Sequence, residues 1–212
     1  MYQEDVMQEI LDRFVVFEGL DGAGTTTQMK LMAEAFDKAG TSCHATFEPT
    51  ASPLGSLVRS VLKKQVVTTP LALAMLFAAD REDHLNHPIT GVVEKTRQGI
   101  VVLCDRYLYS SLSYQSIECG FERVSFLNDF PAPRFLFYID TPVEVCLRRI
   151  EERSDEREIF EKQEFLQKVR DNYELIFSGL QDGIVFTRID GTLGKEEVGR
   201  KALQVIKDAS LL

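Results

Sequence analysis

Short apolar runs alternate with longer amphipathic stretches along almost the whole chain, and this alternation constrains the fold more than any other feature. The apolar runs have the length of buried strands and span 13–19, 44–48, 99–105, 134–140 and 183–190. The stretches between them repeat apolar residues at helical spacing and span 25–38, 53–64, 70–86, 142–152, 161–178 and 194–207. The alternation predicts an α/β fold, a parallel sheet covered by helices on both faces with ligands at the carboxyl ends of the strands.

The composition limits the kinds of partner. The 212 residues, 44% of them hydrophobic, suffice for one well-buried domain over 1–212. A net charge of -9 argues against nucleic acid, because a polyanion would be repelled. Four cysteines without Cys-x-x-Cys spacing indicate reduced thiols. No apolar stretch reaches membrane-spanning length and the amino end lacks the order of a secretory signal, so we expect a cytoplasmic protein with no membrane partner.

The segment FEGLDGAGTTTQ (17–28) resembles a phosphate-binding loop of the pattern G-x-x-x-x-G-K-[ST], with threonine at the lysine position. Its main-chain N–H groups would converge on phosphate oxygens at a helix start, where the helix dipole also favours negative charge. A glycine-rich turn that merely ends a strand is the alternative, and the apolar strand before the segment and the helix after it argue against that. The expected nucleotide-binding residues are Gly19, Asp21, Gly22, Ala23, Gly24, Thr25, Thr26 and Thr27.

Two further motifs point to the same edge of the sheet. LCDRY (103–107) ends an apolar run, so Asp105 and the Thr26 hydroxyl could hold Mg²⁺ while Arg106 clamps a phosphate. A strand-ending Asp-Arg pair is common, however, and by itself says little. In the segment 75–84, Phe77, Arg81 and His84 fall on one helical face, which suits a nucleobase with its polar edge recognised. Core packing with an arginine that extends to solvent explains this second motif equally well.

Together, and in this order, the motifs resemble the thymidylate kinases. The resemblance spans Phe14 to Ile206 and rests on FEGLDGAG, on Glu48-Pro49 followed by PLG and Arg59, on LFAADR, on CDRYLYSSLSYQ and on FLQKVRDNYELI. It implies a P-loop NTPase-type fold with a short helical lid at about 148–161, and Mg²⁺-dependent transfer of the ATP γ-phosphate to dTMP, giving dTDP and ADP. The family forms homodimers. An apolar helical surface at 71–79 could contribute to a dimer, although burial inside one subunit explains that run equally well.

The resemblance also implies roles for individual residues. Phe77 would stack on thymine, while its polar edge would be read by Arg59, Arg81, Ser111 and Gln115. Asp21 would lie near the deoxyribose and the acceptor phosphate, and Glu48 would belong to the substrate site. The expected catalytic residues are Asp21, Arg106 and the lid arginines Arg153 and Arg157. By charge pattern alone the segment 148–165 reads as a solvated helical face, and the resemblance favours a lid.

Two cations of the family pattern are missing. Thr25 replaces lysine, and Phe47 stands where many bacterial relatives have arginine. Loss of a transition-state cation can cost roughly 4 to 7 kcal/mol of the activation barrier. We therefore hypothesise that backbone amides, Mg²⁺ and a cation from Arg149, Arg153 or Arg157 carry the charge. A catalytically weak nucleotide-binding protein with a regulatory role, and a kinase for dUMP or another nucleoside monophosphate, are the alternatives.

Overall fold

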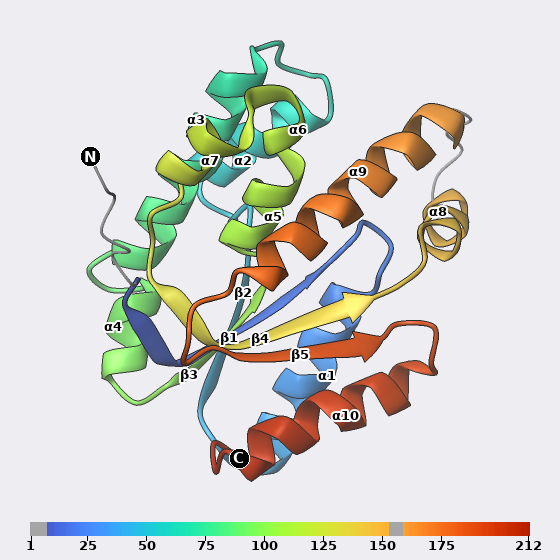
Figure 1. Ribbon diagram of the computed structural model, residues 1–212. Coiled ribbons are helices and arrows are strands. Elements are labelled where there is room, and N and C mark those ends of the chain that lie inside the picture. The colour runs from blue at the N-terminus through green and yellow to red at the C-terminus, as the bar shows by residue number, and fades with distance from the viewer. Residues whose placement is uncertain (1–7, 153–158) are drawn as a thin grey trace.

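The fold centres on one sheet of five parallel strands, in the order β2-β3-β1-β4-β5, in a computed structural model that describes residues 8–152 and 159–212. All five predicted strands are present: β1 (Ile10–Gly19), β2 (Cys43–Phe47), β3 (Val101–Asp105), β4 (Ala132–Asp140) and β5 (Val185–Asp190). In Figure 1 β4 points towards α8 (Val143–Glu151), and because every strand pairing is parallel, the carboxyl ends of all five strands form one edge of the sheet. The predicted α/β architecture is confirmed.

The central strand β1 is buried on both faces, as a parallel sheet requires. Phe14, Val15, Val16 and Phe17 have no exposed surface, and the Phe17 ring stacks on Phe137 of β4 with the ring centroids 5.2 Å apart. The strand register aligns Phe47 of β2 and Phe17 of β1 with Asp105 of β3. The residues that follow these three strands therefore emerge side by side.

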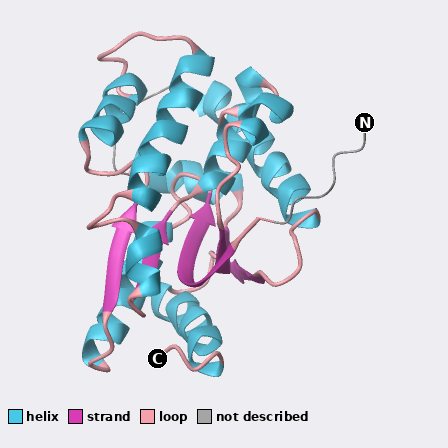
Figure 2. Cartoon of the chain, turned by 90° about the vertical axis from the view of Figure 1, so that its left-hand side faces the viewer, coloured by secondary structure: helices cyan, strands magenta, loops and turns pink. Residues whose placement is uncertain are grey.

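Helices cover both faces of the sheet, as predicted. Long helices α1 (Thr25–Lys38) and α10 (Lys195–Asp208) lie on one face, while α5 (Leu108–Tyr114) and α9 (Ile159–Ser178) lie on the other (Figure 1). A quarter turn shows the strands running between these helical layers (Figure 2). The remaining helices are α2 (Pro53–Leu62), α3 (Pro70–Asn86), α4 (Val92–Arg97), α6 (Ser116–Cys119) and α7 (Phe121–Phe126).

The six long helices match the predicted ranges to within a few residues, and four short ones were not predicted. Helices α4 to α7 have four to seven residues each, too few for a helical repeat of apolar positions to be recognised in sequence. Of the predicted lid, residues 148–151 belong to α8 and α9 begins at Ile159. Arg153 and Arg157 lie outside the described residues, so the lid stays a prediction.

The structure also bears on the compositional predictions. All four cysteines are free thiols, and Cys104, Cys119 and Cys146 are buried. Within the described ranges, no helix combines the length and apolar character needed to cross a membrane. In that same part of the chain, no cluster of three or more histidine, cysteine, aspartate or glutamate residues has the arrangement of a metal site.

Candidate active site

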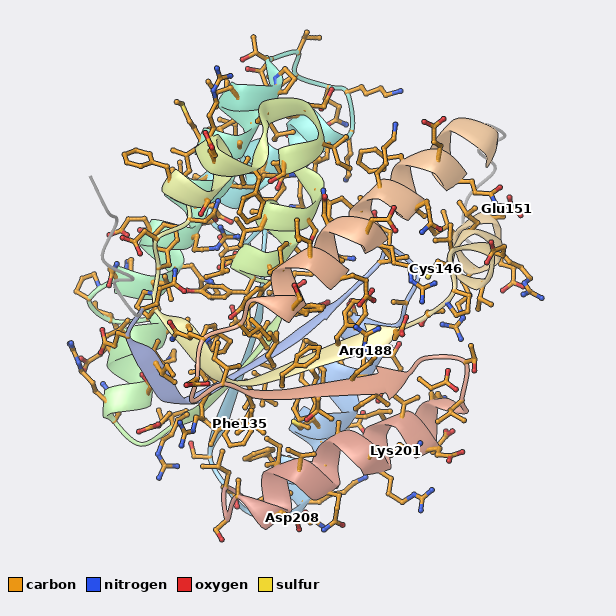
Figure 3. The ribbon with its side chains drawn as sticks, in the orientation of Figure 1. Phe135, Cys146, Glu151, Arg188, Lys201 and Asp208 are labelled. Atoms are coloured by element: carbon orange, nitrogen blue, oxygen red, sulfur yellow. The ribbon has the colours of Figure 1, made fainter. Side chains whose placement is uncertain are left out.

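The phosphate loop connects β1 to α1 through two glycines with left-handed backbone angles, Gly22 at φ +85° and Gly24 at φ +106°. A Cβ atom on Gly22 would lie 2.6 Å from the carbonyl oxygen of Cys146 in α8, so no side chain fits there. Cys146 and Glu151 mark α8 beyond the sheet edge in Figure 3. No side chain caps the start of α1, so the amide groups of its first turn remain available to an anion.

Thr25 does not reproduce the function of a lysine in this loop. Its side chain is buried, and its Cγ2 methyl lies 3.2 Å from the position that a Cβ atom on Gly19 would occupy. The methyl group therefore packs underneath the loop, next to the glycine that ends β1. Position 25 supplies packing and backbone geometry, and no positive charge.

Thr26 and Asp105 place two side-chain oxygen groups, a hydroxyl and a carboxylate, next to each other beside the loop. The Thr26 hydroxyl donates a hydrogen bond to Oδ2 of Asp105. Oδ1 of Asp105 is buried and has no hydrogen-bond partner within the described residues. A hydroxyl and a carboxylate oxygen that lacks a donor are ligands suited to Mg²⁺, so the residues present fit this ion.

Arg106 is fixed at the loop by contacts on three sides. It has φ +70°, an uncommon conformation for a residue with a side chain. Its NH2 group donates to Asp21 Oδ1 at 2.8 Å and its NH1 group to Ser110 Oγ at 3.1 Å, while the guanidinium lies over the Tyr114 ring. The Tyr114 hydroxyl accepts a hydrogen bond from the Asp21 N–H group. A planar cation is thus held next to the loop in one orientation.

Below Arg106, the carboxylate of Glu18 joins β1 to the start of α5. Glu18 is fully buried and accepts hydrogen bonds from the Tyr107 N–H group (2.9 Å), the Ser110 N–H group (3.1 Å), the Ser110 hydroxyl (2.6 Å) and the Tyr173 hydroxyl (2.8 Å). Burial raises the pKa of Glu18 to about 7, although the positive charge of Arg106 and these hydrogen bonds oppose the rise. Sequence reasoning missed this residue because it ends an apolar run.

A cleft of about 530 Å³ extends from Thr26 and Asp105 to a group of side chains suited to a nucleobase. Phe77, Arg81, Ser111 and Gln115 line its far end. Arg81 is fully buried and donates from Nε to Glu48 Oε2 (2.8 Å) and from NH2 to Ser111 Oγ (3.1 Å). The alternative of an arginine that extends to solvent is therefore wrong.

Arg59 was predicted to contact the base, but it does not line the cleft. Its guanidinium donates to the carbonyl oxygens of Pro49 and Thr50 and to the Ser56 hydroxyl. The same turn is held by buried Asp80, which accepts from the Thr50 N–H group at 2.7 Å and from the Thr50 hydroxyl at 2.6 Å. Arg59 and Asp80 thus shape the chain between β2 and α2.

A second cavity, of about 220 Å³, is lined by Gly22, Ala23, Gly24 and Thr27 of the loop and by Arg149 of α8. The Arg149 guanidinium donates to the carbonyl oxygens of Gly22 (3.3 Å), Ala23 (3.2 Å) and Gly191 (3.0 Å). The two cavities share no lining residue, and the phosphate loop contributes to both. The loop therefore borders two separate spaces.

The family model for thymidylate kinase matches residues 17–202 of the chain. The chain belongs to the thymidylate kinase family. Its relatives include proteins from Treponema pallidum (44% identical over 169 residues, 79% of this chain and 80% of the relative), Aeropyrum pernix (39% over 195 residues, 91% and 92%) and Methanococcus aeolicus (35% over 209 residues, 95% and 100%). Their names assign all three provisionally to the thymidylate kinases.

The thymidylate kinase residues predicted from sequence fall into four groups. The large cleft brings together Asp21, Thr26, Glu48, Phe77, Arg81, Asp105, Arg106, Ser111 and Gln115. The smaller cavity is lined by Gly22, Ala23, Gly24 and Thr27, whereas Gly19, Thr25 and Arg59 line neither space. Arg153 and Arg157 cannot be placed. The roles of all these residues stay predictions.

Sequence reasoning did not predict several residues that line the large cleft, among them the polar residues Lys30, Ser110 and Tyr114. Lys30 lies four residues after Thr26 in α1, on the same helical face, which is the signal that could have identified it. The exposed Lys30 side chain forms no ion pair with any carboxylate of residues 8–152 or 162–212. By contrast, Arg81 and Arg106 each pair with a carboxylate.

The raised pKa of Glu18 predicts how stability depends on pH. The pKa in the folded state lies above the ordinary value of 4.5, so the protonated form is favoured, and its stabilising contribution is complete below pH 4.5 and lost as the pH rises towards 7. Across this window Glu18 should lower the free energy of unfolding by up to about 3 kcal/mol.

Glu18→Gln should remove this contribution, because an amide carries no proton to lose and can still bond to the surrounding groups. Urea denaturation at pH 4.5 and at pH 7.5 measures the difference, with Glu34→Gln on the exposed side of α1 as the control. Equal pH dependence of wild type and Glu18→Gln would contradict the prediction.

Proposed function

We propose that the protein is a thymidylate kinase that transfers the γ-phosphate of ATP to dTMP in the presence of Mg²⁺, giving dTDP and ADP. One observation carries this proposal: a single cleft joins a ring and an arginine suited to a nucleobase with the Thr26–Asp105 pair and Arg106 at the phosphate loop. The cleft thus offers a place for the base of the acceptor and for its phosphate, with the loop at one end.

The acceptor would bind along this cleft. Phe77 would stack on thymine, and Arg81, Ser111 and Gln115 would form hydrogen bonds with its polar edge. Arg106, held by Asp21, would bind phosphate oxygens with its planar guanidinium. A donor of the ATP type would fit the smaller cavity, where Arg149 already lies on the loop.

The transfer would depend on neutralising negative charge without a lysine at position 25. Thr26 and Asp105 would hold Mg²⁺, which when bound neutralises charge on the phosphates. Loop amides, Arg106 and Arg149 would supply the other positive groups. Arg153 and Arg157 remain predicted lid cations. Of the three arginines in the compensation hypothesis, Arg149 has a described position, and it supports a cation at the donor side.

A homodimer in the cytoplasm completes the proposal. The predicted apolar surface 71–79 lies in α3, which packs against α2. Within one chain, Leu57, Leu62 and Met75 of these helices remain 39%, 52% and 50% exposed. Apolar side chains with this exposure support a contact with a second copy. Free thiols favour a reducing compartment.

The test of the function is incubation of purified protein with MgCl₂, ATP and dTMP, followed by separation of the nucleotides. Formation of dTDP supports the proposal, and binding of dTMP without product over long incubation would support the regulatory alternative. A panel with dUMP, dCMP and dGMP decides the acceptor. Faster turnover of dUMP than of dTMP would overturn the assignment of thymidylate as substrate.

Thr25→Lys should tighten ATP binding or raise the turnover rate, because an ammonium group at this position can reach the β- and γ-phosphates. Steady-state kinetics with varied ATP measure both parameters. Ser42→Lys, at an exposed position away from the loop, is the control for added charge. No change in either parameter in Thr25→Lys would mean that another group already occupies that position.

Lys30→Met should weaken binding of dTMP about tenfold and leave binding of thymidine unchanged, because a cation that pairs with no carboxylate of the described residues can bind the acceptor phosphate. Calorimetry with dTMP and with thymidine separates the phosphate from the nucleoside. Lys38→Met, at the exposed end of α1, is the matched control. Equal losses for both ligands would assign Lys30 a structural role.

A further inference from the structure

A chain of hydrogen bonds between partly and fully buried side chains leads from β2 through α3 to the base end of the cleft. The Thr46 hydroxyl lies 2.8 Å from Nε2 of His84, and Nδ1 of His84 lies 2.9 Å from Glu48 Oε1. The other carboxylate oxygen, Glu48 Oε2, lies 2.7 Å from NH2 and 2.8 Å from Nε of Arg81. The side chains of His84, Glu48 and Arg81 are 8%, 3% and 1% exposed.

The partners determine which nitrogen of His84 carries the proton. Arg81 is a permanent cation, so Glu48 is its carboxylate counter-ion and can only accept hydrogen bonds. Nδ1 of His84 must therefore donate to Glu48. Nε2 lies within hydrogen-bond distance of the Thr46 hydroxyl, which can donate or accept, so both ring nitrogens have a partner. The charges of Glu48 and Arg81 balance each other, as a buried pair requires.

His84 fixes the carboxylate that in turn fixes Arg81. With Oε1 of Glu48 bound to His84, Oε2 is presented to Arg81. The same guanidinium donates to Ser111 Oγ and to Asn128 Oδ1, so it is held from three sides. Arg81 and Ser111 line the cleft, and His84 is absent from the lining among the described residues. His84 can thus act on a ligand only through Glu48 and Arg81.

We propose that His84 is a positioning residue that sets the specificity for the base of the acceptor, by holding Glu48 and through it the Arg81 guanidinium. The inference rests on the proposed function. A guanidinium has donors and no acceptor, so at a fixed position it favours a pyrimidine that presents a carbonyl oxygen and disfavours one that presents an amino group. The base class selected is thymine or uracil over cytosine.

Two substitutions of His84 test the hydrogen bonds of its two ring nitrogens separately. His84→Asn keeps an amide N–H group near the place of Nδ1, facing Glu48, whereas His84→Gln places its amide near Nε2, facing Thr46. His84→Asn should retain most of the preference for dTMP over dCMP. His84→Gln and His84→Ala should raise the KM for dTMP about tenfold, lower the ratio of kcat/KM for dTMP to that for dCMP by a similar factor, and leave kcat within about threefold.

The matched control is His87→Gln, because His87 is the C-cap residue of α3 and accepts hydrogen bonds from the N–H groups of Ile89 and Thr90 in its own turn. Binding of dTMP and dCMP measured by calorimetry without ATP gives the same discrimination independently of turnover. If dTMP binds but no dTDP forms, the proposed kinase activity would be wrong, while the role of His84 in selecting the base could still be tested by binding. The role of His84 would be overturned if His84→Asn and His84→Gln lost the preference for dTMP to the same extent, or if kcat fell at unchanged KM. It would also be overturned if the ratio of kcat/KM for dTMP to that for dCMP stayed unchanged, or if the wild type bound neither nucleotide.

Discussion

The hydrogen bonds accepted by Glu18 are the interaction on which the phosphate end of the site depends. They join the carboxyl end of the central strand to the start of α5 and to α9, three segments that are far apart in sequence. Ser110, which donates to Glu18, also accepts from Arg106. A carboxylate inside the protein thereby determines where a guanidinium at the surface of the cleft is held.

The part of the cleft near Phe77 and Arg81 is held in the same way, by a different pair of charges. Arg81 and Glu48 are both buried, and the cost of removing two ions from water offsets much of their attraction. Such a pair is therefore weak evidence for stability, and it is better explained by the fixed direction of its donors. Glu18 lies at the carboxyl end of β1 and Glu48 directly follows β2, so the parallel sheet brings both supports to one edge.

The sequence predicted the architecture because buried strands and long amphipathic helices have distinct periodicities. Nine residues of the large cleft were also predicted, from the motifs near the ends of β1, β2 and β3 and in α3 and α5, and from the family resemblance that these motifs carry. It could not predict the burial of Arg81, because Glu48 lies 33 residues away and the pairing depends on the fold. Arg59 was expected to face the base, but main-chain oxygens of the turn after Pro49 compete for the same donors. The absence of lysine was visible in the sequence, whereas the inward orientation of the Thr25 methyl group was not.

The close approach of Gly22 to the backbone of α8 has a consequence for where charge can reside. Any side chain at position 22 would collide with the Cys146 carbonyl group, so an arginine cannot be accommodated there. From Gly22 to Met29 the chain contains no ionisable side chain at all. Every positive charge that meets a donor nucleotide must come from another segment or from a metal ion. Phosphoryl transfer then depends on cations from outside the loop, because Asp21, a carboxylate, is the one ionisable side chain between Gly19 and Met29.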